Sequence, residues 1–256
     1  MRYVVFNRKG GVGKSTITCN LAAVAAEDGA RVLVVDLDPQ GNATQYLSGR
    51  QPGEIEPNLH GYFDETLGFR LSRTPPSSFA HATSVDGVHL LAAASELSEL
   101  QPKLESRHKI YKLRDLLDVL NSYDHVFIDT PPAVNFFTVS ALIASHRCLI
   151  PFDCDEFSRR ALYRLLDTVR EVREDHNPKL EVGGVVVNQF DARANLPGQL
   201  VAELEEEGLP VLSPYLGATV KVRESHQQHQ PLVTYLPRHK VSEQFRVLWR
   251  GLRDAS

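Results

Sequence analysis

A glycine-rich segment close to the first residue constrains this chain more than any other feature. It reads Lys9-Gly10-Gly11-Val12-Gly13-Lys14-Ser15-Thr16, after the β-rich run Tyr3–Phe6 and before a helical pattern of apolar residues. Glycines let the backbone curl until several N–H groups point at one centre, and the helix adds its positive N-terminal end. This context predicts a phosphate-binding loop in which Lys14 reaches the β- and γ-phosphates and the Ser15 hydroxyl ligates Mg²⁺.

Two other interpretations of this segment fit less well. A glycine-rich turn beside an unrelated lysine would not require a Lys-Ser pair at the start of a helix. A dinucleotide-binding loop of the pattern GxGxxG lacks that pair as well. The segment therefore predicts a P-loop NTPase.

Short β-branched runs alternate with amphipathic stretches, which is typical of βαβ units and a parallel sheet. We expect strands at Tyr3–Phe6, Val32–Val35, Val88–Ala92, Val126–Ile128, Cys148–Phe152, Val182–Val187 and Pro210–Leu212. Helical spacing of apolar residues predicts a helix over 157–172, and the Pro-, Gly-, Ser- and His-rich segment 48–86 predicts a long loop or small insertion. The simplest fold is α/β, with one doubly wound, mostly parallel sheet flanked by helices in a single domain, 1–256.

Acidic residues end two of the expected strands. Asp36 and Asp38 follow one apolar run, and Asp129 follows another. An isolated aspartate at a strand end usually caps a turn or a helix. Three of them together with a phosphate loop favour one shared Mg²⁺ and ATP site, where an aspartate such as Asp129 holds Mg²⁺ through its water shell.

Composition excludes several other classes of protein. Three cysteines without a CxxC pair argue against a zinc finger or a disulfide framework. The chain begins without a secretory signal and has no apolar stretch long enough to span a bilayer, so we expect a cytoplasmic protein. Residues 213–256 contain seven Lys or Arg against three acidic residues, although the whole chain carries a net charge of -4. Such a basic end indicates either a polyanionic partner or a solvated helical face.

Three motifs resemble the ParA/MinD superfamily of P-loop ATPases. They are KGGVGKST at 9–16, VDLDPQGNAT at 35–44 and FIDTPP at 127–132. The resemblance spans nearly the whole chain, although Arg8 stands where the family usually has glutamine and 50–86 matches poorly. Within the superfamily the chain resembles the ParA-type plasmid or chromosome partition ATPases. Because the loop begins so near Met1, we expect the short form, without an N-terminal helix-turn-helix.

The resemblance implies a role for each motif residue. The segment from Lys9 to Thr16 would surround the phosphates, with Lys9 reaching across a homodimer to the partner's nucleotide. Asp38 would orient or activate the attacking water, and Asp36 would support the Mg²⁺ shell with Ser15 and Asp129. Asn188 would read the adenine edge and Pro214 would lie near the ring. From the residues alone, Asn188 could equally cap its strand.

The resemblance also implies macromolecular partners. In relatives of this type the ATP-bound dimer binds double-stranded DNA without sequence preference, and a ParB-type centromere-binding protein accelerates hydrolysis. The basic positions that match are Arg193, Lys221 and Arg223. A nucleoid-associated location follows from this resemblance.

The last helical pattern carries a basic face of its own. Arg246, Arg250 and Arg253 recur at i, i+4 and i+7 beside an apolar stripe. Such a face either binds DNA phosphates or is simply exposed to solvent, and the spacing is compatible with both.

Four rival functions were weighed against partition of DNA. A MinD-like membrane-associated positioning ATPase would place the Trp-containing last helix at a membrane, but its stripe suits a helix packed in the fold, so we expect no membrane partner. An iron–sulfur relative would need a cysteine soon after Asp129. An inactive ATP site is disfavoured by the set Lys14, Ser15, Asp38 and Asp129. A metabolic kinase is left open, because sequence does not reveal a pocket for a phosphate acceptor.

Overall fold

The computed structural model describes residues 1–69 and 72–255, apart from the side chains of 156–158, so Phe157 of the expected helical stripe lies outside the described residues. Eight strands form one sheet in the order β3-β4-β2-β5-β1-β6-β7-β8. The strands are β1 (Arg2–Val5), β2 (Val32–Asp36), β3 (Ala80–Ala82), β4 (Val88–Leu91), β5 (His125–Asp129), β6 (Arg147–Phe152), β7 (Glu181–Val187) and β8 (Val211–Leu212). All neighbours pair in parallel except β3, which is antiparallel to β4.

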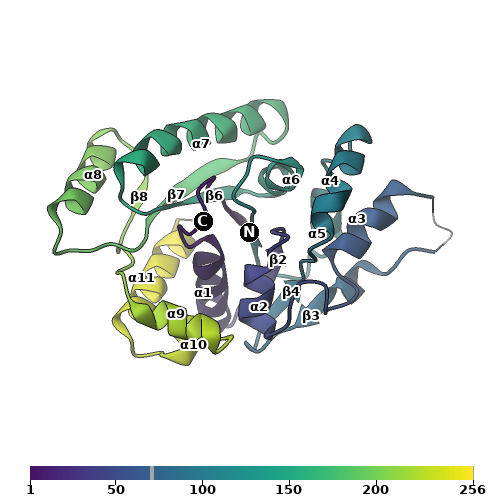
Figure 1. The fold of residues 1–256 in the computed structure, drawn as a ribbon, viewed down its shortest axis with the longest axis horizontal. Coiled ribbons are helices and arrows are strands. Elements are labelled where there is room, and N and C mark those ends of the chain that lie inside the picture. The colour runs from purple at the N-terminus through teal and green to yellow at the C-terminus, as the bar shows by residue number, and fades with distance from the viewer. Residues whose placement is uncertain (70–71, 256) are drawn as a thin grey trace.

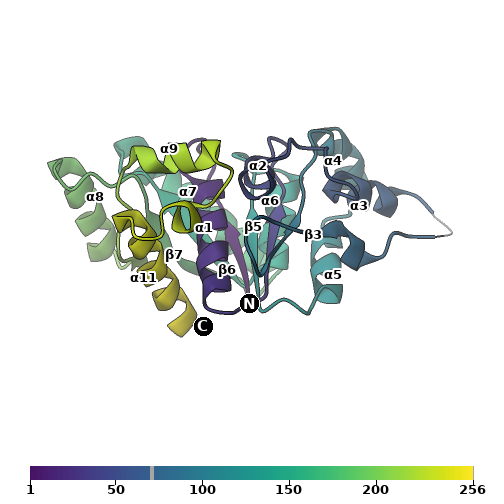
Figure 2. The same ribbon diagram turned by 90° about the horizontal axis from the view of Figure 1, so that it is seen from below.

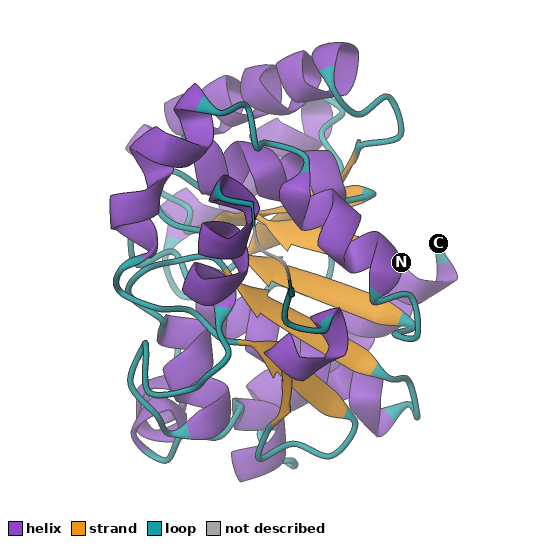
Figure 3. Cartoon of the chain, turned by 90° about the vertical axis from the view of Figure 1, so that its right-hand side faces the viewer, coloured by secondary structure: helices purple, strands orange, loops and turns teal. Residues whose placement is uncertain are grey.

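Helices cover both faces of this sheet (Figures 1 and 3). One layer contains α1 (Lys14–Glu27), α2 (Asn42–Ser48), α9 (Val220–Gln227), α10 (Leu232–Tyr235) and α11 (Lys240–Asp254). The other contains α3 (Leu59–Leu67), α4 (Leu97–Ser106), α5 (Lys112–Val119), α6 (Phe136–Ala144), α7 (Glu156–Asp175) and α8 (Asn195–Glu206). The prediction of a doubly wound α/β fold is confirmed. No helix in the described part of the chain is both long and apolar enough to cross a bilayer.

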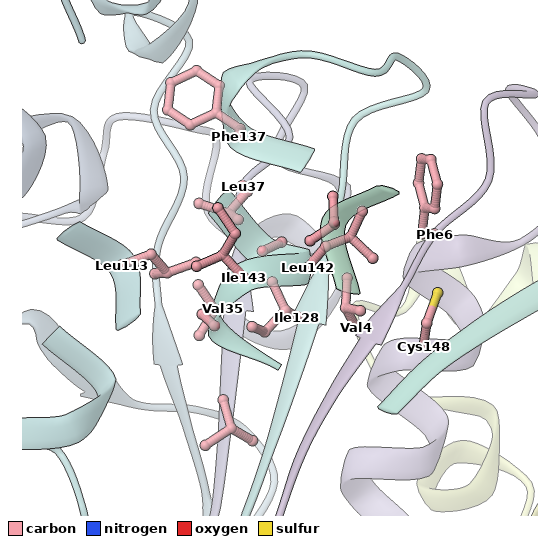
Figure 4. Close-up of a cluster of buried hydrophobic side chains, with 14 of the residues drawn as sticks. Val4, Phe6, Val35, Leu37, Leu113, Ile128, Phe137, Leu142, Ile143 and Cys148 are labelled. Carbon is pink, nitrogen blue, oxygen red and sulfur yellow. The ribbon is translucent and has the colours of Figure 1, made fainter. Parts of the chain in front are cut away.

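The strands supply side chains to both layers because successive residues point to opposite faces. Val4 and Phe6 join the core cluster beneath α3 to α8, whereas Tyr3 and Val5 join the cluster beneath α1, α2, α10 and α11. Figure 4 shows part of the first cluster, in which side chains of the central strands meet those of α5 and α6. The almost continuous apolar runs of the central strands are therefore the mark of a sheet buried on both sides.

The segment 48–86 is more regular than the long loop that its composition predicts. It contains α3, the 3₁₀ turn Pro76–Phe79 and the edge strand β3. The Asn58 side chain caps α3 by accepting a hydrogen bond from the backbone of Gly61. Phe63 and Phe79 anchor the segment in the core. Leu59, Tyr62, Phe63 and Leu67 have helical spacing and pack on the core. This pattern spans only nine residues, and the surrounding Pro, Gly, Ser and His residues outweigh it in composition.

The sheet has a topological switch point at β1, which lies between β5 and β6. The chain leaves β1 toward β2 on one side and later returns to build β6, β7 and β8 on the other. Ligands of open α/β sheets bind in the crevice at the carboxyl ends of strands at such a point. The glycine-rich segment follows the carboxyl end of β1 and therefore lies there.

Candidate nucleotide-binding site

The glycine-rich loop leaves β1 and enters α1 at Lys14. Gly11 and Gly13 adopt φ values of 78° and 92°, which side chains rarely tolerate. A Cβ atom on Gly13 would lie 2.3 Å from the amide nitrogen of Asn188. Gly13 is therefore required both for the left-handed backbone and for the close approach of the Asn188 side chain, which follows β7.

The metal-binding candidates meet directly. The Ser15 hydroxyl lies 2.5 Å from Oδ2 of Asp129, at the end of β5. Oδ1 of Asp129 is buried without a hydrogen-bond partner, and burial, reinforced by nearby Asp36, raises the pKa of this carboxyl well above its usual range. A hydroxyl beside a carboxylate with an unsatisfied oxygen fits a hard divalent cation such as Mg²⁺.

Lys14 is buried beside these acids. Its ammonium donates to the carbonyl oxygen of Lys9 at 3.1 Å. Burial lowers its pKa, against the opposing effects of Asp129 and Asp38. A bound phosphate would offer this ammonium a far stronger acceptor than a neutral carbonyl.

Asp36 and Asp38 differ in their surroundings. Oδ2 of Asp36 accepts hydrogen bonds from the backbone and hydroxyl of Thr44, at 2.7 and 2.8 Å, and Oδ1 accepts one from the backbone of Asp38 at 3.2 Å. Burial raises the pKa of Asp36 to about 7. These contacts tie Asp36 to the first turns of α2. Its expected support of the Mg²⁺ shell stays a prediction. Asp38 instead lines a cavity together with Lys14.

Two cavities meet at the loop. The first, here called the loop cavity, has a volume of about 360 Å³ and includes Lys14, Ser15 and Asp38 in its lining. The second, the Asn188 cavity, has a volume of about 520 Å³. Both are lined in part by the same four residues, which are Gly11, Gly13, Thr16 and His226. A groove of this combined size accommodates a drug-sized ligand such as a nucleotide.

Asn188 is among the described residues that line the Asn188 cavity and Pro214 is not, and adenine recognition by either residue stays a prediction. The Asn188 amide donates to the carbonyl of Val12 at 2.8 Å, and Gln189 donates to that of Gly11 at 3.0 Å. Among the described residues, the wall opposite is formed by Gly217–Val220 and not by Pro214. Sequence reasoning missed Gln189 and His226, because no local motif marks a residue that only tertiary packing brings to the loop.

Lys9 contacts acidic groups of its own chain. Its ammonium lies 2.6 Å from Oδ2 of Asp153 and also contacts Asp155. The Lys9 side chain remains 38% exposed. Among the described residues that line the two cavities, Lys9 is absent. Its side chain therefore points away from the nucleotide pocket of its own subunit.

The candidate DNA-binding residues separate into two groups. On α11, Arg246 pairs with Glu27 of α1 at 2.8 Å and Arg250 pairs with Glu243 at 3.0 Å. Lys221 pairs with Glu224 within α9, at 2.7 Å, whereas Arg223 and Arg193 are exposed. The α11 arginines therefore stabilise the seam between α1 and α11 or their own helix, and Lys221 is paired within α9. The exposed Arg193 and Arg223 are the better candidates for an external anion.

The loop, the Ser15–Asp129 contact and their place at the switch point define a P-loop nucleotide-binding protein. A profile of the AAA domain family matches residues 2–182. The chromosome partitioning protein ParA of Myxococcus xanthus is 32% identical over 254 residues, which is 97% of this chain and 86% of that protein. The sporulation initiation inhibitor protein Soj of Bacillus subtilis is 32% identical over 244 residues, 93% of this chain and 92% of that protein.

Among solved structures, cobyrinic acid a,c-diamide synthase from Mycobacterium smegmatis, with a bound ATP analogue and magnesium, superposes with a TM-score of 0.84. It is 28% identical, and the match covers 98% of this chain and 93% of that one. The chain belongs to the AAA domain family, as a ParA/Soj-type partition ATPase of the ParA/MinD superfamily.

Proposed function

We propose that this partition ATPase binds ATP and Mg²⁺ across the two cavities and closes as a homodimer around two nucleotides. In that state it binds double-stranded DNA without sequence preference, and a ParB-type partner stimulates hydrolysis, so that the cycle moves or positions DNA cargo on the nucleoid. The observation that carries the proposal is the Ser15–Asp129 contact, with its unsatisfied carboxylate oxygen, beside a glycine loop that lines both cavities.

The hydroxyl, ammonium and carboxyl groups at the loop cavity have separate tasks in this cycle. Ser15 and Asp129 would hold Mg²⁺, which supplies neutralisation of charge on the phosphates. Lys14 would exchange the Lys9 carbonyl for phosphate oxygens. Asp38 reaches the same cavity and would orient the attacking water by accepting its hydrogen bond.

Dimer closure would use Lys9. Its ion pairs with Asp153 and Asp155 are partly exposed, so a phosphate of the facing subunit can compete for the ammonium. A lysine from each subunit would then contact its partner's nucleotide, which makes the closed state dependent on ATP.

The DNA-binding step would use Arg193 and Arg223, with smaller contributions from Lys221, Arg246 and Arg250 because these three are already ion-paired. Contacts of this kind displace counterions from DNA, so affinity should fall steeply with salt and be blind to sequence.

Binding to random duplex DNA tests the proposal, measured with ATP, ADP or no nucleotide across a salt series. We expect tight, salt-sensitive binding with ATP only, and none with ATP in Lys14→Ala, which should not bind nucleotide. Absence of DNA binding in every nucleotide state would overturn the DNA step and leave the ATPase assignment. Binding to anionic liposomes in that case would identify a membrane-associated ATPase instead.

A further inference from the structure

A histidine far from the loop in sequence lies against it in the fold. His226, in the last turn of α9, places Nε2 3.1 Å from the hydroxyl of Thr16 in α1. Its ring meets the Tyr46 ring edge-on, with 4.2 Å between ring centroids. Figure 2 shows α9, α1 and α2 together on one side of the sheet. His226 is thus held between the helix that begins at the phosphate loop and the helix that follows Asp38.

The hydrogen bonds behind His226 fix its position. Tyr46 shares a hydrogen bond of 2.7 Å with the Ser225 hydroxyl and accepts one from the backbone of Leu232 at 3.1 Å. Asn20 accepts a hydrogen bond from the backbone of Val233 at 3.1 Å. These buried contacts connect the segment from α9 to α10 with α1 and α2, so the imidazole is presented by a rigid support.

His226 lies at the junction of the two cavities. The loop cavity contains Lys14, Ser15 and Asp38, the residues suited to the β- and γ-phosphates and the metal. The Asn188 cavity contains the candidate for the base. Of the four residues that line both cavities, three belong to the loop and the start of α1, and His226 is the fourth. If the base lies in the Asn188 cavity and the β- and γ-phosphates lie in the loop cavity, the α-phosphate would pass this point.

We propose that His226 is a nucleotide-contacting residue whose ring nitrogen donates a hydrogen bond to the α-phosphate. The inference rests on the proposed ATP-binding function and adds to it a contact from outside the loop. In the structure Nε2 of His226 and the Thr16 hydroxyl are 3.1 Å apart and hydrogen-bonded to each other. A phosphate oxygen would replace this contact and accept hydrogen bonds from both the imidazole N–H and the hydroxyl. The side chain is exposed to the cavities and therefore accessible to a ligand.

The contact has a recognisable signature because the α-phosphate is common to ATP and ADP. Loss of the His226 donor should weaken both nucleotides by the same factor, whereas loss of a contact to the γ-phosphate would weaken ATP alone. A hydrogen bond to a charged group is worth enough to change affinity by about tenfold or more.

Isothermal titration calorimetry of the full chain with Mg²⁺ and ATP, ADP or ATPαS tests the inference. ATPαS carries sulfur in place of a non-bridging oxygen on the α-phosphate, and sulfur is the weaker hydrogen-bond acceptor. We expect His226→Ala to weaken ATP and ADP about tenfold each and to reduce the wild-type preference for ATP over ATPαS. His226→Gln, which keeps an N–H donor, should recover part of the affinity. Gln227→Ala, an exposed neighbour on α9, is the matched control and should bind as the wild type does.

If His226→Ala binds ATP and ADP each with the same affinity as the wild type, the inference is overturned while the ATP site stands. An unchanged preference for ATP over ATPαS would overturn it as well, and so would an equal loss in Gln227→Ala, since either would reflect a general disturbance of α9. If the wild type itself does not bind ATP, the proposed function fails, and this outcome is distinct from the others.

Discussion

The ammonium of Lys9 lies 2.6 Å from Oδ2 of Asp153, so the lysine that opens the phosphate loop is held by its own subunit. Burial opposes the charge of Lys9, but hydrogen bonds to Asp153 and Asp155 outweigh it and raise the pKa. A partly exposed pair of this kind contributes about 1 kcal/mol or less. The contact holds the Lys9 side chain in place in this structure and is weak enough to be exchanged for a phosphate of a facing subunit.

Replacement of Lys9 should therefore separate nucleotide binding from dimerisation. We expect Lys9→Ala to bind ATP with nearly wild-type affinity but to remain monomeric with ATP in multi-angle light scattering. Arg8→Ala, one residue away and exposed, is the control and should dimerise normally. An ATP-dependent Lys9→Ala dimer would refute the role of this lysine across the interface.

The role proposed for Asp38 is tested by turnover. Removal of a positioned base or water-orienting group typically costs 10²- to 10⁴-fold in rate, so Asp38→Ala should release phosphate at least about a hundredfold more slowly. Because Lys14, Ser15 and Asp129 remain, ATP binding should persist and the variant should accumulate as an ATP-bound dimer on DNA. Wild-type turnover in this variant would be incompatible with the assignment.

The parts of the site that sequence predicts are those with local chemistry. The loop needs glycines at positive φ followed by Lys14 and Ser15, and an apolar strand ending in Asp129 is visible without a structure. The same holds for the fold, whose seven predicted strands correspond to β1, β2 and β4 to β8. Each of these features is written in consecutive residues.

The parts that sequence misses depend on partners distant in the chain. Thr44 donates two hydrogen bonds to one Asp36 oxygen and ties that carboxyl to α2. Glu27 pairs with Arg246 across 219 positions and links this predicted DNA-contacting arginine to α1. No periodicity encodes such pairings, because they are set by how α2 and α11 pack against α1.

Burial of Asp36 predicts a pH dependence of stability. Its pKa is about 7 in the fold and about 4 in an unfolded chain. Between these values the folded protein binds a proton that the unfolded chain has lost, so stability falls as pH rises from about 4 to about 7. Asn at this position cannot titrate. The advantage of the wild type over Asp36→Asn in free energy of unfolding, measured by denaturation at each pH, should therefore shrink or reverse as pH rises toward about 7. Parallel pH profiles would show that Asp36 ionises normally.

The two groups of basic residues should respond differently to substitution. Arg223→Ala should weaken ATP-dependent DNA binding. It should also reduce the slope of log affinity against log salt concentration by about one. Arg250→Ala removes a side chain already paired with Glu243, so its effect on DNA affinity should be smaller. Fluorescence anisotropy with labelled duplex, at saturating ATP, measures both. A larger loss of DNA affinity in Arg250→Ala than in Arg223→Ala would place the DNA-binding surface on α11.

Trp249 decides whether α11 belongs to the folded core. It is 1% exposed, its indole N–H donates to Oδ2 of Asp28 at 2.9 Å, and its ring packs against Phe127 with centroids 5.8 Å apart. Trp249→Ala should destabilise the protein by about 3–5 kcal/mol, the usual cost of emptying a buried aromatic site.

Chemical denaturation measures that cost, with Val247→Ala, an exposed position on the same helix, as the control. Trp249→Phe should lose less, because it keeps a ring in the site and Asp28 retains its ion pair with Arg253. A near-zero effect of Trp249→Ala would mean that α11 contributes little to the core. Its apolar, Trp-containing face would then be free to leave the sheet for a membrane surface, whereas the full loss ties that face to the core beside α1.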